Sequence, residues 1–137
     1  MSAIVYDPVA YPVFKCTDAL DAGGYVLKLN SDGTVSKASA SDEAFGINVA
    51  GVTDWQGNAI TPPIEVAVLP VGRGQIVMLQ LDPSNLEIAI GDPLCIDANT
   101  AGVVDKRDGT ENTADRIAIA LEAKSAGSGG MIKALLL

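Results

Sequence analysis

Histidine is absent from this sequence, and cysteine and the aromatic residues are scarce: two cysteines and 4% aromatics among 137 residues. Histidine is the side chain that most often transfers protons in catalysis, and it also activates nucleophilic cysteine. Two cysteines without histidine make a zinc site unfavourable. We therefore expect a protein that is not an enzyme and that uses no cofactor or metal.

Basic residues are also few, because 9 lysines and arginines stand against 17 aspartates and glutamates, for a net charge of −8. Nucleic acids and anionic membranes bind clustered lysine and arginine, so neither is an expected partner. No apolar run approaches the ~18 residues of a membrane span, and residues 1–14 lack the features of a signal peptide. We expect synthesis in the cytosol, with Cys16 and Cys95 as reduced, buried thiols; a bridge between them is the alternative.

Short apolar segments with a period of two are common in this chain, and no segment keeps the helical period over three turns. The segment "YVLKLN" alternates in this way and leads into "SDGT", where Asp32-Gly33 predicts a tight turn. The pattern predicts an all-β fold, a small β-barrel-like domain with at most one or two short helical turns. Residues 39–44 and 82–87 are the candidates for those turns, because Ser and Asp cap helices well.

The strand pattern is written twice. Four features of the first half recur in the second in the same order, which indicates pseudo-repeated halves at about 20–81 and 86–137 of a single β domain, 16–137. The resembling pairs are residues 24–38 and 91–107, the turn glycines Gly33 and Gly102, residues 46–52 and 116–122, and "GQIVMLQL" (74–81) and "GMIKALLL" (130–137).

Residues 1–15 have no counterpart in the second half and contain two prolines but no glycine. Proline is excluded from central strands and helix interiors, so an extended apolar arm is expected. The arm either lies on its own domain as a strand or adds to the sheet edge of a partner. Its candidate contact residues are Ile4, Val5, Tyr6, Pro8, Val9, Tyr11, Pro12, Val13 and Phe14.

An oligomer interface is suggested by three further features. The insertion 53–63 carries the only tryptophan, which either folds back on the domain or anchors a partner. The segment "IAIALEA" has one face of small residues, which favours close approach by another sheet or subunit, and the chain ends on an apolar strand. The candidate interface residues are Trp55, Glu122, Leu135, Leu136 and Leu137.

Motifs for chemistry are incomplete in this sequence. The stretch 97–102 begins like a half-site of aspartic proteases and like a calcium loop, but the residues after Asp97 fit neither pattern. An enzyme would instead require a cleft with perturbed carboxylates, for which Glu65, Asp97 and Glu122 are the candidates.

The segments "AIGDPLCID", "RIAIALEA" and "SAGSGGMIKALLL" resemble the small capsid decoration proteins of tailed bacteriophages, also called cement or head-stabilising proteins. The resemblance covers roughly residues 20–52 and 64–137. It implies a β-tulip fold that binds as homotrimers to the outer surface of an expanded viral capsid. The protein would then be found on the virion, and in the host cytoplasm while the virion is being assembled. It also implies that the N-terminal arm joins the sheets of the major capsid protein.

A different function remains as an alternative: another oligomeric virion β scaffold, or a surface module that binds a carbohydrate or receptor. That alternative predicts an exposed Trp55, with the ligand bound at the loop 53–63.

Overall fold

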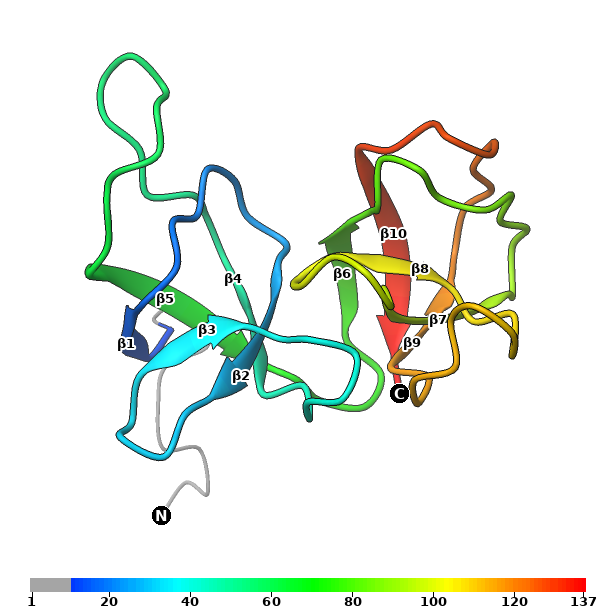
Figure 1. Cartoon of the computed structure of the whole chain (residues 1–137), viewed down its shortest axis with the longest axis horizontal. Coiled ribbons are helices and arrows are strands. Elements are labelled where there is room, and N and C mark those ends of the chain that lie inside the picture. Colours follow the sequence, from blue (N-terminus) through cyan, green and yellow to red (C-terminus); the bar gives the residue numbers. More distant parts are fainter. Residues whose placement is uncertain (1–10) are drawn as a thin grey trace.

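The computed structural model describes residues 11–137, and this part of the chain holds ten strands and no helix (Figure 1). The prediction of a small all-β fold is confirmed. No helix in the described residues could cross a membrane. The strands are β1 Val13–Cys16, β2 Val26–Leu29, β3 Val35–Lys37, β4 Gly46–Asn48, β5 Ile64–Pro70, β6 Ile76–Gln80, β7 Pro93–Ile96, β8 Val104–Lys106, β9 Ala118–Ala120 and β10 Met131–Leu136.

The short helical turns expected at 39–44 and 82–87 are reverse turns. In the first, the N–H of Asp42 donates to the carbonyl of Ser39 over 3.0 Å. In the second, the N–H of Asn85 donates to the carbonyl of Asp82 over 3.0 Å. Each turn closes on one such bond, and no helix follows either of them.

The first five strands form a closed barrel in the order β1-β3-β2-β4-β5. Strand β1 closes it, because Cys16 pairs in parallel with Val35 of β3 and antiparallel with Ile64 of β5. The barrel has a core of its own, in which Leu20, Leu27, Val35, Val66 and Val68 are buried. We call residues 11–70 the barrel unit.

The last five strands form a sheet in the order β6-β10-β9-β7-β8. A parallel bridge between Leu81 and Val104 also joins the end of β6 to β8, so the order is nearly closed into a circle. The same circular order results if β6 corresponds to β1, β7 to β2, β8 to β3, β9 to β4 and β10 to β5. The parallel pairs Cys16–Val35 and Leu81–Val104 then occupy equivalent places. We call residues 74–137 the sheet unit.

This correspondence corrects one equivalence expected from the sequence. The similar segments 74–81 and 130–137 are not two copies of one strand, because β6 and β10 are antiparallel neighbours with Leu79 opposite Ile132. The counterpart of β10 is β5, and the counterpart of β6 is β1. The structural repeat therefore begins at β1 in the first half and at β6 in the second, rather than near residues 20 and 86.

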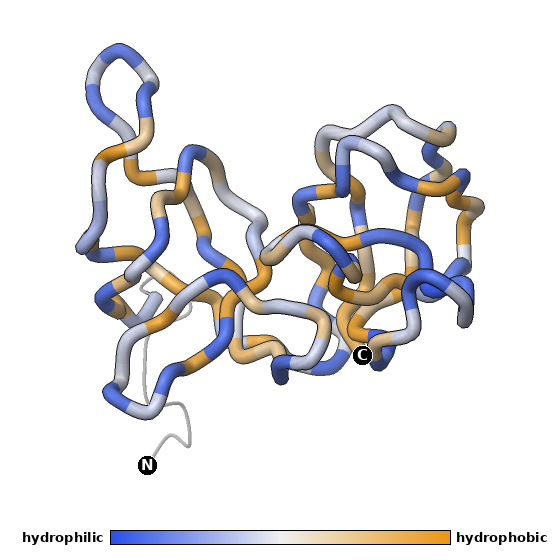
Figure 2. Tube along the Cα trace, in the orientation of Figure 1, coloured by the Kyte–Doolittle hydropathy of each residue, from blue (hydrophilic) through white to orange (hydrophobic). Residues whose placement is uncertain are grey.

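The two units share a core across a seam. Val26, Ala38 and Ile47 of the barrel unit pack with the buried side chains of the sheet unit. Backbone bonds cross the seam as well: Val26 donates to Gly102 over 2.9 Å, and Gly102 donates to Ala38 over 2.8 Å. In Figure 2 the apolar residues gather along the strands, and polar residues occupy most loop tips. The shared core and the backbone bonds across the seam fix the two units relative to each other.

Candidate functional site

The predicted arm overlaps the barrel at its C-terminal end. Val13, Phe14 and Lys15 belong to β1 and pair with β5 of their own chain. The Phe14 ring packs edge-to-face on Phe45 with centroids 5.3 Å apart, whereas Val13 points outward and is 60% exposed. The structure therefore moves the end of the arm back to Pro12. The candidate contact residues Ile4, Val5, Tyr6, Pro8 and Val9 lie outside the described residues.

Strand β5 limits the hydrogen bonds that it can donate to the chain before β1. The N–H of Val68 donates to the carbonyl of Pro12 over 2.9 Å. Alternate residues of a strand bond to the same neighbour, so the next donor on this side of β5 would be residue 70. Residue 70 is a proline, which has no N–H. Strand β5 therefore offers no further donor to the chain that precedes Pro12.

The outer face of the sheet unit carries a row of apolar side chains. Ile76, Leu135, Ile119 and Pro93 are successive cross-strand partners on β6, β10, β9 and β7. Ile76 is 64% exposed, and the other three are half-buried. Cross-strand partners project to the same side of a sheet, so these four residues form one strip, which we call the outer row.

The predicted interface residues on β10 divide between the two sides of the sheet. Leu135 lies in the outer row, and Leu137 is 43% exposed just beyond it. Leu136 points inward and is 2% exposed, so its assignment to an interface is wrong. The small face of β9 also points inward, since Ala118 and Ala120 are fully buried in the core that the two units share.

Glu122 is engaged within its own chain. Its Oε1 accepts the N–H of Lys133 over 2.9 Å and lies 4.0 Å from Nζ of Lys124. The side chain remains partly exposed at the surface of the sheet unit. Glu122 therefore lies beside β10.

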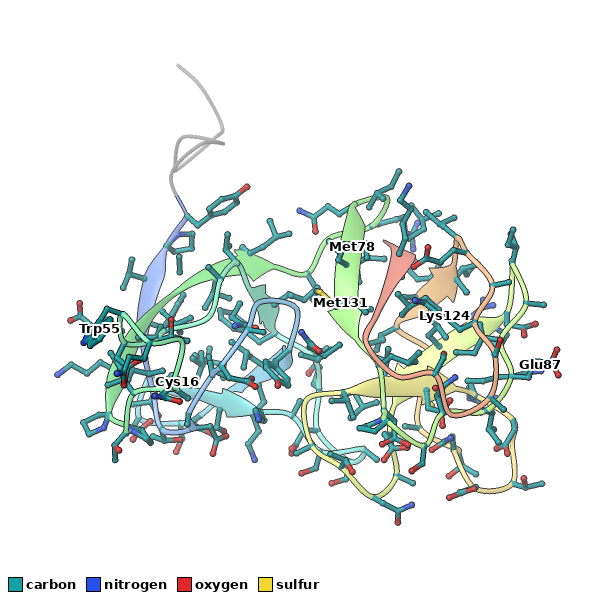
Figure 3. All side chains as sticks on the ribbon, turned by 90° about the horizontal axis from the view of Figure 1, so that it is seen from above. Cys16, Trp55, Met78, Glu87, Lys124 and Met131 are labelled. Carbon is teal, nitrogen blue, oxygen red and sulfur yellow. The ribbon has the colours of Figure 1, made fainter. Side chains whose placement is uncertain are left out.

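A groove runs along the seam beside the outer row. Its volume is about 210 Å³, and it contains no charged residue. Gly24 allows the two units to approach closely at the seam. A Cβ at this position would lie 2.7 Å from both Cε of Met131 and the carbonyl oxygen of Met78. Figure 3 shows Met78 and Met131 between the two units. The principal lining residues are Tyr11, Ile47, Val49, Val77, Met78 and Met131.

Trp55 is 91% exposed, so the expectation that it folds back on the domain is wrong and the alternative of an exposed residue holds. Its loop is nonetheless well braced. Thr53 and Ala59 form a bridge across the base of the loop, and Oδ1 of Asp54 accepts the N–H groups of Gln56 and Asn58 at 2.9 Å each. These bonds hold the pKa of Asp54 below its usual value, so its charge persists.

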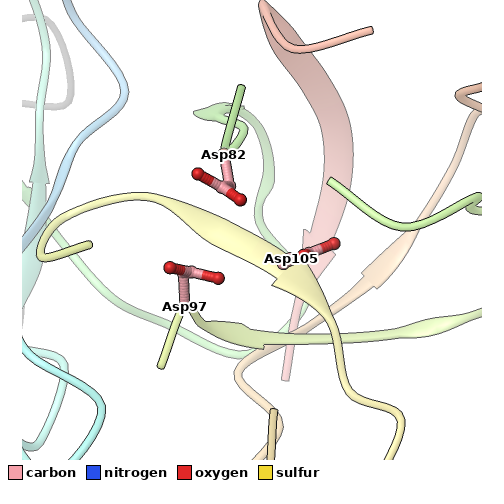
Figure 4. A group of neighbouring side chains, drawn as sticks. All are labelled: Asp82, Asp97 and Asp105. Carbon is pink, nitrogen blue, oxygen red and sulfur yellow. The ribbon is translucent and has the colours of Figure 1, made fainter. Parts of the chain in front are cut away.

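Three carboxylates meet in the sheet unit, where Asp82, Asp97 and Asp105 place oxygens within 4.8 Å of one another (Figure 4). Asp97 and Asp105 are almost fully buried. Burial raises the pKa of Asp105, and the neighbouring Asp97 charge adds to this. Burial likewise raises the pKa of Asp82, again with a contribution from Asp97.

Carboxylate oxygens are the ligands that hard cations such as calcium prefer. Each buried carboxylate here already accepts two backbone N–H groups: Asp97 from Asn99 and Thr100, and Asp105 from Leu86 and Lys106. Sequence reasoning missed the cluster, because its members follow β6, follow β7 and lie in β8, and no local motif links them. The backbone bonds account for the burial of the two carboxylates without an ion.

Both cysteines are free and buried, as expected. Burial raises the pKa of the Cys16 thiol, and it raises that of Cys95 to about 11. A thiol with a raised pKa holds little of the nucleophilic thiolate at neutral pH. Both side chains therefore serve packing.

The candidate surface residues thus form two separate groups, one on each unit. The outer row, the groove, Glu122, Leu135 and Leu137 lie on or beside the sheet unit, whereas Trp55 lies on a loop of the barrel unit. The carboxylates suggested for an enzyme do not gather: Asp97 joins the acidic cluster, but Glu65 lies on β5 and Glu122 follows β9. In comparisons with known proteins, no family model and no curated protein matches this chain.

Proposed function

We propose that this protein is a structural capsid decoration protein of the β-tulip type. It binds the outer surface of an expanded viral capsid as a homotrimer and stabilises the shell. It is present in the host cytoplasm while the virion is being assembled. Its N-terminal segment up to Pro12 adds to a sheet of the major capsid protein. The observation that carries this proposal is Pro70, which leaves β5 without a further N–H on this side beyond the bond from Val68 to Pro12.

The missing N–H of Pro70 favours pairing of the N-terminal segment with another chain. The segment is apolar and rich in extended-chain formers. Strand addition needs a backbone that has not already found its donors and acceptors, and Pro70 removes the donor that β5 would otherwise supply. Tyr11 and Val13, which are both exposed, continue the apolar character to the surface of the barrel.

The outer row supports self-association. It sets apolar side chains from four neighbouring strands in one strip on the sheet surface, with Leu137 beside it. Apolar side chains gathered in one strip of the surface favour an interaction site there. Leu135 and Leu137 are the residues that we assign to the trimer interface.

The test is a deletion that stops before the barrel. Removing residues 1–10 leaves β1 intact, and we expect a folded protein that no longer cosediments with expanded, undecorated capsids. Val5→Asp is expected to weaken attachment strongly, because it puts a charge into the added strand, whereas Ser2→Asp serves as the matched control. Attachment of the deletion variant at the affinity of the full chain would refute the role of the segment.

A carbohydrate- or receptor-binding module is the second candidate, and the exposure of Trp55 favours it. Sugar sites combine an aromatic face with free polar groups, however, and the carboxylate of Asp54 is already bonded to its own loop. Titration of the protein with a glycan panel, followed by tryptophan fluorescence, separates the two candidates. A saturable change with one glycan would favour this second function.

A further inference from the structure

Trp55 is presented to solvent as a preformed knob. The base of its loop is closed by the Thr53–Ala59 bridge, and Asp54 holds the turn through two backbone N–H groups. A large aromatic side chain on a braced loop loses little conformational freedom when it is buried by a partner. Tryptophan is also the residue most enriched at the energetic centres of protein interfaces.

The seam groove is a matching hole. A cavity of about 150 Å³ is enough to hold benzene, and the groove measures about 210 Å³, which gives room for an indole. Tyr11 offers an aromatic face, and Met78 and Met131 offer polarisable sulfur atoms, which favour contact with aromatic rings.

Knob and hole lie apart in one molecule. Figure 3 shows Trp55 at the end of the barrel unit that is far from Met78 and Met131, and in Figure 1 the loop 53–63 projects away from the sheet unit. Trp55 therefore cannot fill the groove of its own chain, but a second copy can supply it.

One charge beside Trp55 and one beside the groove are opposite in sign, although Glu122 also lies beside Lys133. Lys133 is exposed and lies directly across from Met78 in the β6–β10 pair. Asp54, next to Trp55, stays ionised because backbone N–H groups stabilise its carboxylate. A copy that inserts its tryptophan beside Met78 brings Asp54 towards Lys133, which fixes the orientation of the contact.

We propose that Trp55 of one copy inserts into the seam groove of the next copy. The contact is head-to-tail, so it closes into a ring when the rotation between copies is a simple fraction of a turn, as in a trimer. This inference rests on the self-association in the proposed function, and its test does not require capsids.

The experiment uses the full-length protein and its single tryptophan, whose emission reports on this one side chain. Native mass spectrometry and emission spectra are recorded over a dilution series. We expect the emission to shift to shorter wavelength, and acrylamide quenching to fall, as oligomers form. Trp55→Ala is expected to weaken self-association about 30-fold or more, the effect of losing a central tryptophan.

Val49→Glu probes the hole from the other side, because Val49 is an exposed residue of the groove rim. It is expected to weaken self-association to a similar degree, and the double variant is expected to be little worse than either single one, since both remove the same contact. Ile90→Ala is the control, because Ile90 is exposed but does not line the groove. Circular dichroism verifies that each variant is folded.

The outcomes separate this inference from the proposed function. Oligomers that form while Trp55 keeps the emission of an exposed indole would overturn the inference alone, and so would additive effects in the double variant. A protein that stays monomeric at every concentration, in solution and on capsids, would overturn the self-association as well. A blue shift that accompanies oligomers and is lost with Val49→Glu would establish the contact.

Discussion

The N–H of Val68 in β5 lies 2.9 Å from the carbonyl oxygen of Pro12, the residue that precedes β1. Two residues further along β5 stands Pro70, at the position whose N–H would make the next bond. Beyond the bond from Val68, β5 therefore has no further N–H to offer on this side.

Replacing Pro70 by a residue with a backbone N–H is expected to change how far β5 can pair with the chain before β1. Pro70→Ala supplies an N–H on the side of β5 that pairs with β1, so the ladder can extend by one more pair. We expect unchanged or slightly higher thermal stability, together with weaker attachment to capsids. Hydrogen exchange read at residue 70, combined with cosedimentation, checks this. If the new amide exchanges freely and attachment is unaltered, Pro70 does not set the end of the pairing.

The two neighbours at the C-terminus are expected to behave differently. Leu136→Ala should lower the free energy of unfolding by about 3 kcal/mol, because it opens a cavity in the shared core. Leu137→Ala removes a side chain that is 43% exposed and should change stability little. Urea denaturation of both variants measures the difference. Equal losses would show that Leu136 is not the inward-facing residue.

Two turn glycines provide a graded test. Gly33 and Gly102 both have positive φ, of 86° and 82°. At Gly33 a Cβ would meet nothing, so Gly33→Val is expected to cost about 1–2 kcal/mol from backbone strain alone. At Gly102 a Cβ would also lie 2.9 Å from Cγ of Lys37. We therefore expect a larger loss for Gly102→Val in chemical denaturation, and a smaller loss there would contradict the packing at the seam.

The acidic cluster predicts an unusual response to pH. The pKa values of Asp82 and Asp105 are raised in the folded state, so the folded protein binds more protons than the unfolded chain between the ordinary aspartate pKa and the raised values. The contribution of these two groups to stability is therefore present at low pH and is lost as the pH rises through the raised pKa values.

Asp82→Asn removes one of the three charges and is expected to raise stability at neutral pH, by ~0.5 kcal/mol, the scale of a partly exposed charge pair. The variant should also lose less stability than the unchanged protein as the pH rises above the ordinary aspartate pKa. Thermal unfolding of both proteins at several pH values measures this. Asp108 shows the opposite shift, to a pKa of about 2, so Asp108→Asn is a control for acid effects of the usual sign.

The strands and turns could be predicted from local patterns, because a period of two and a glycine with positive φ depend on neighbouring residues alone. Part of the repeat was also visible, since matching glycines precede β2 and β7 and lie in the turns that lead to β3 and β8. The equivalence of β6 with β10 failed, because two apolar strands that pair with each other resemble one another as much as two copies do.

The sequence alone could not predict which face of β10 is buried. It also could not predict that the three acidic side chains come together. Alternation separates Leu136 from Leu135 and Leu137, but only the position of the shared core decides which side points inward. Asp82, Asp97 and Asp105 meet through pairing between distant strands. The exposure of Trp55 follows from an insertion that points away from both cores.

Closure of the barrel through β1 has a consequence at high copy number. An open sheet presents unpaired N–H and C=O groups that can template a neighbour, and crowded molecules of that kind polymerise edge to edge. Here β1 occupies both lateral positions at once, beside β3 and beside β5. Densely arrayed copies can therefore sit side by side without their barrels fusing into fibrils.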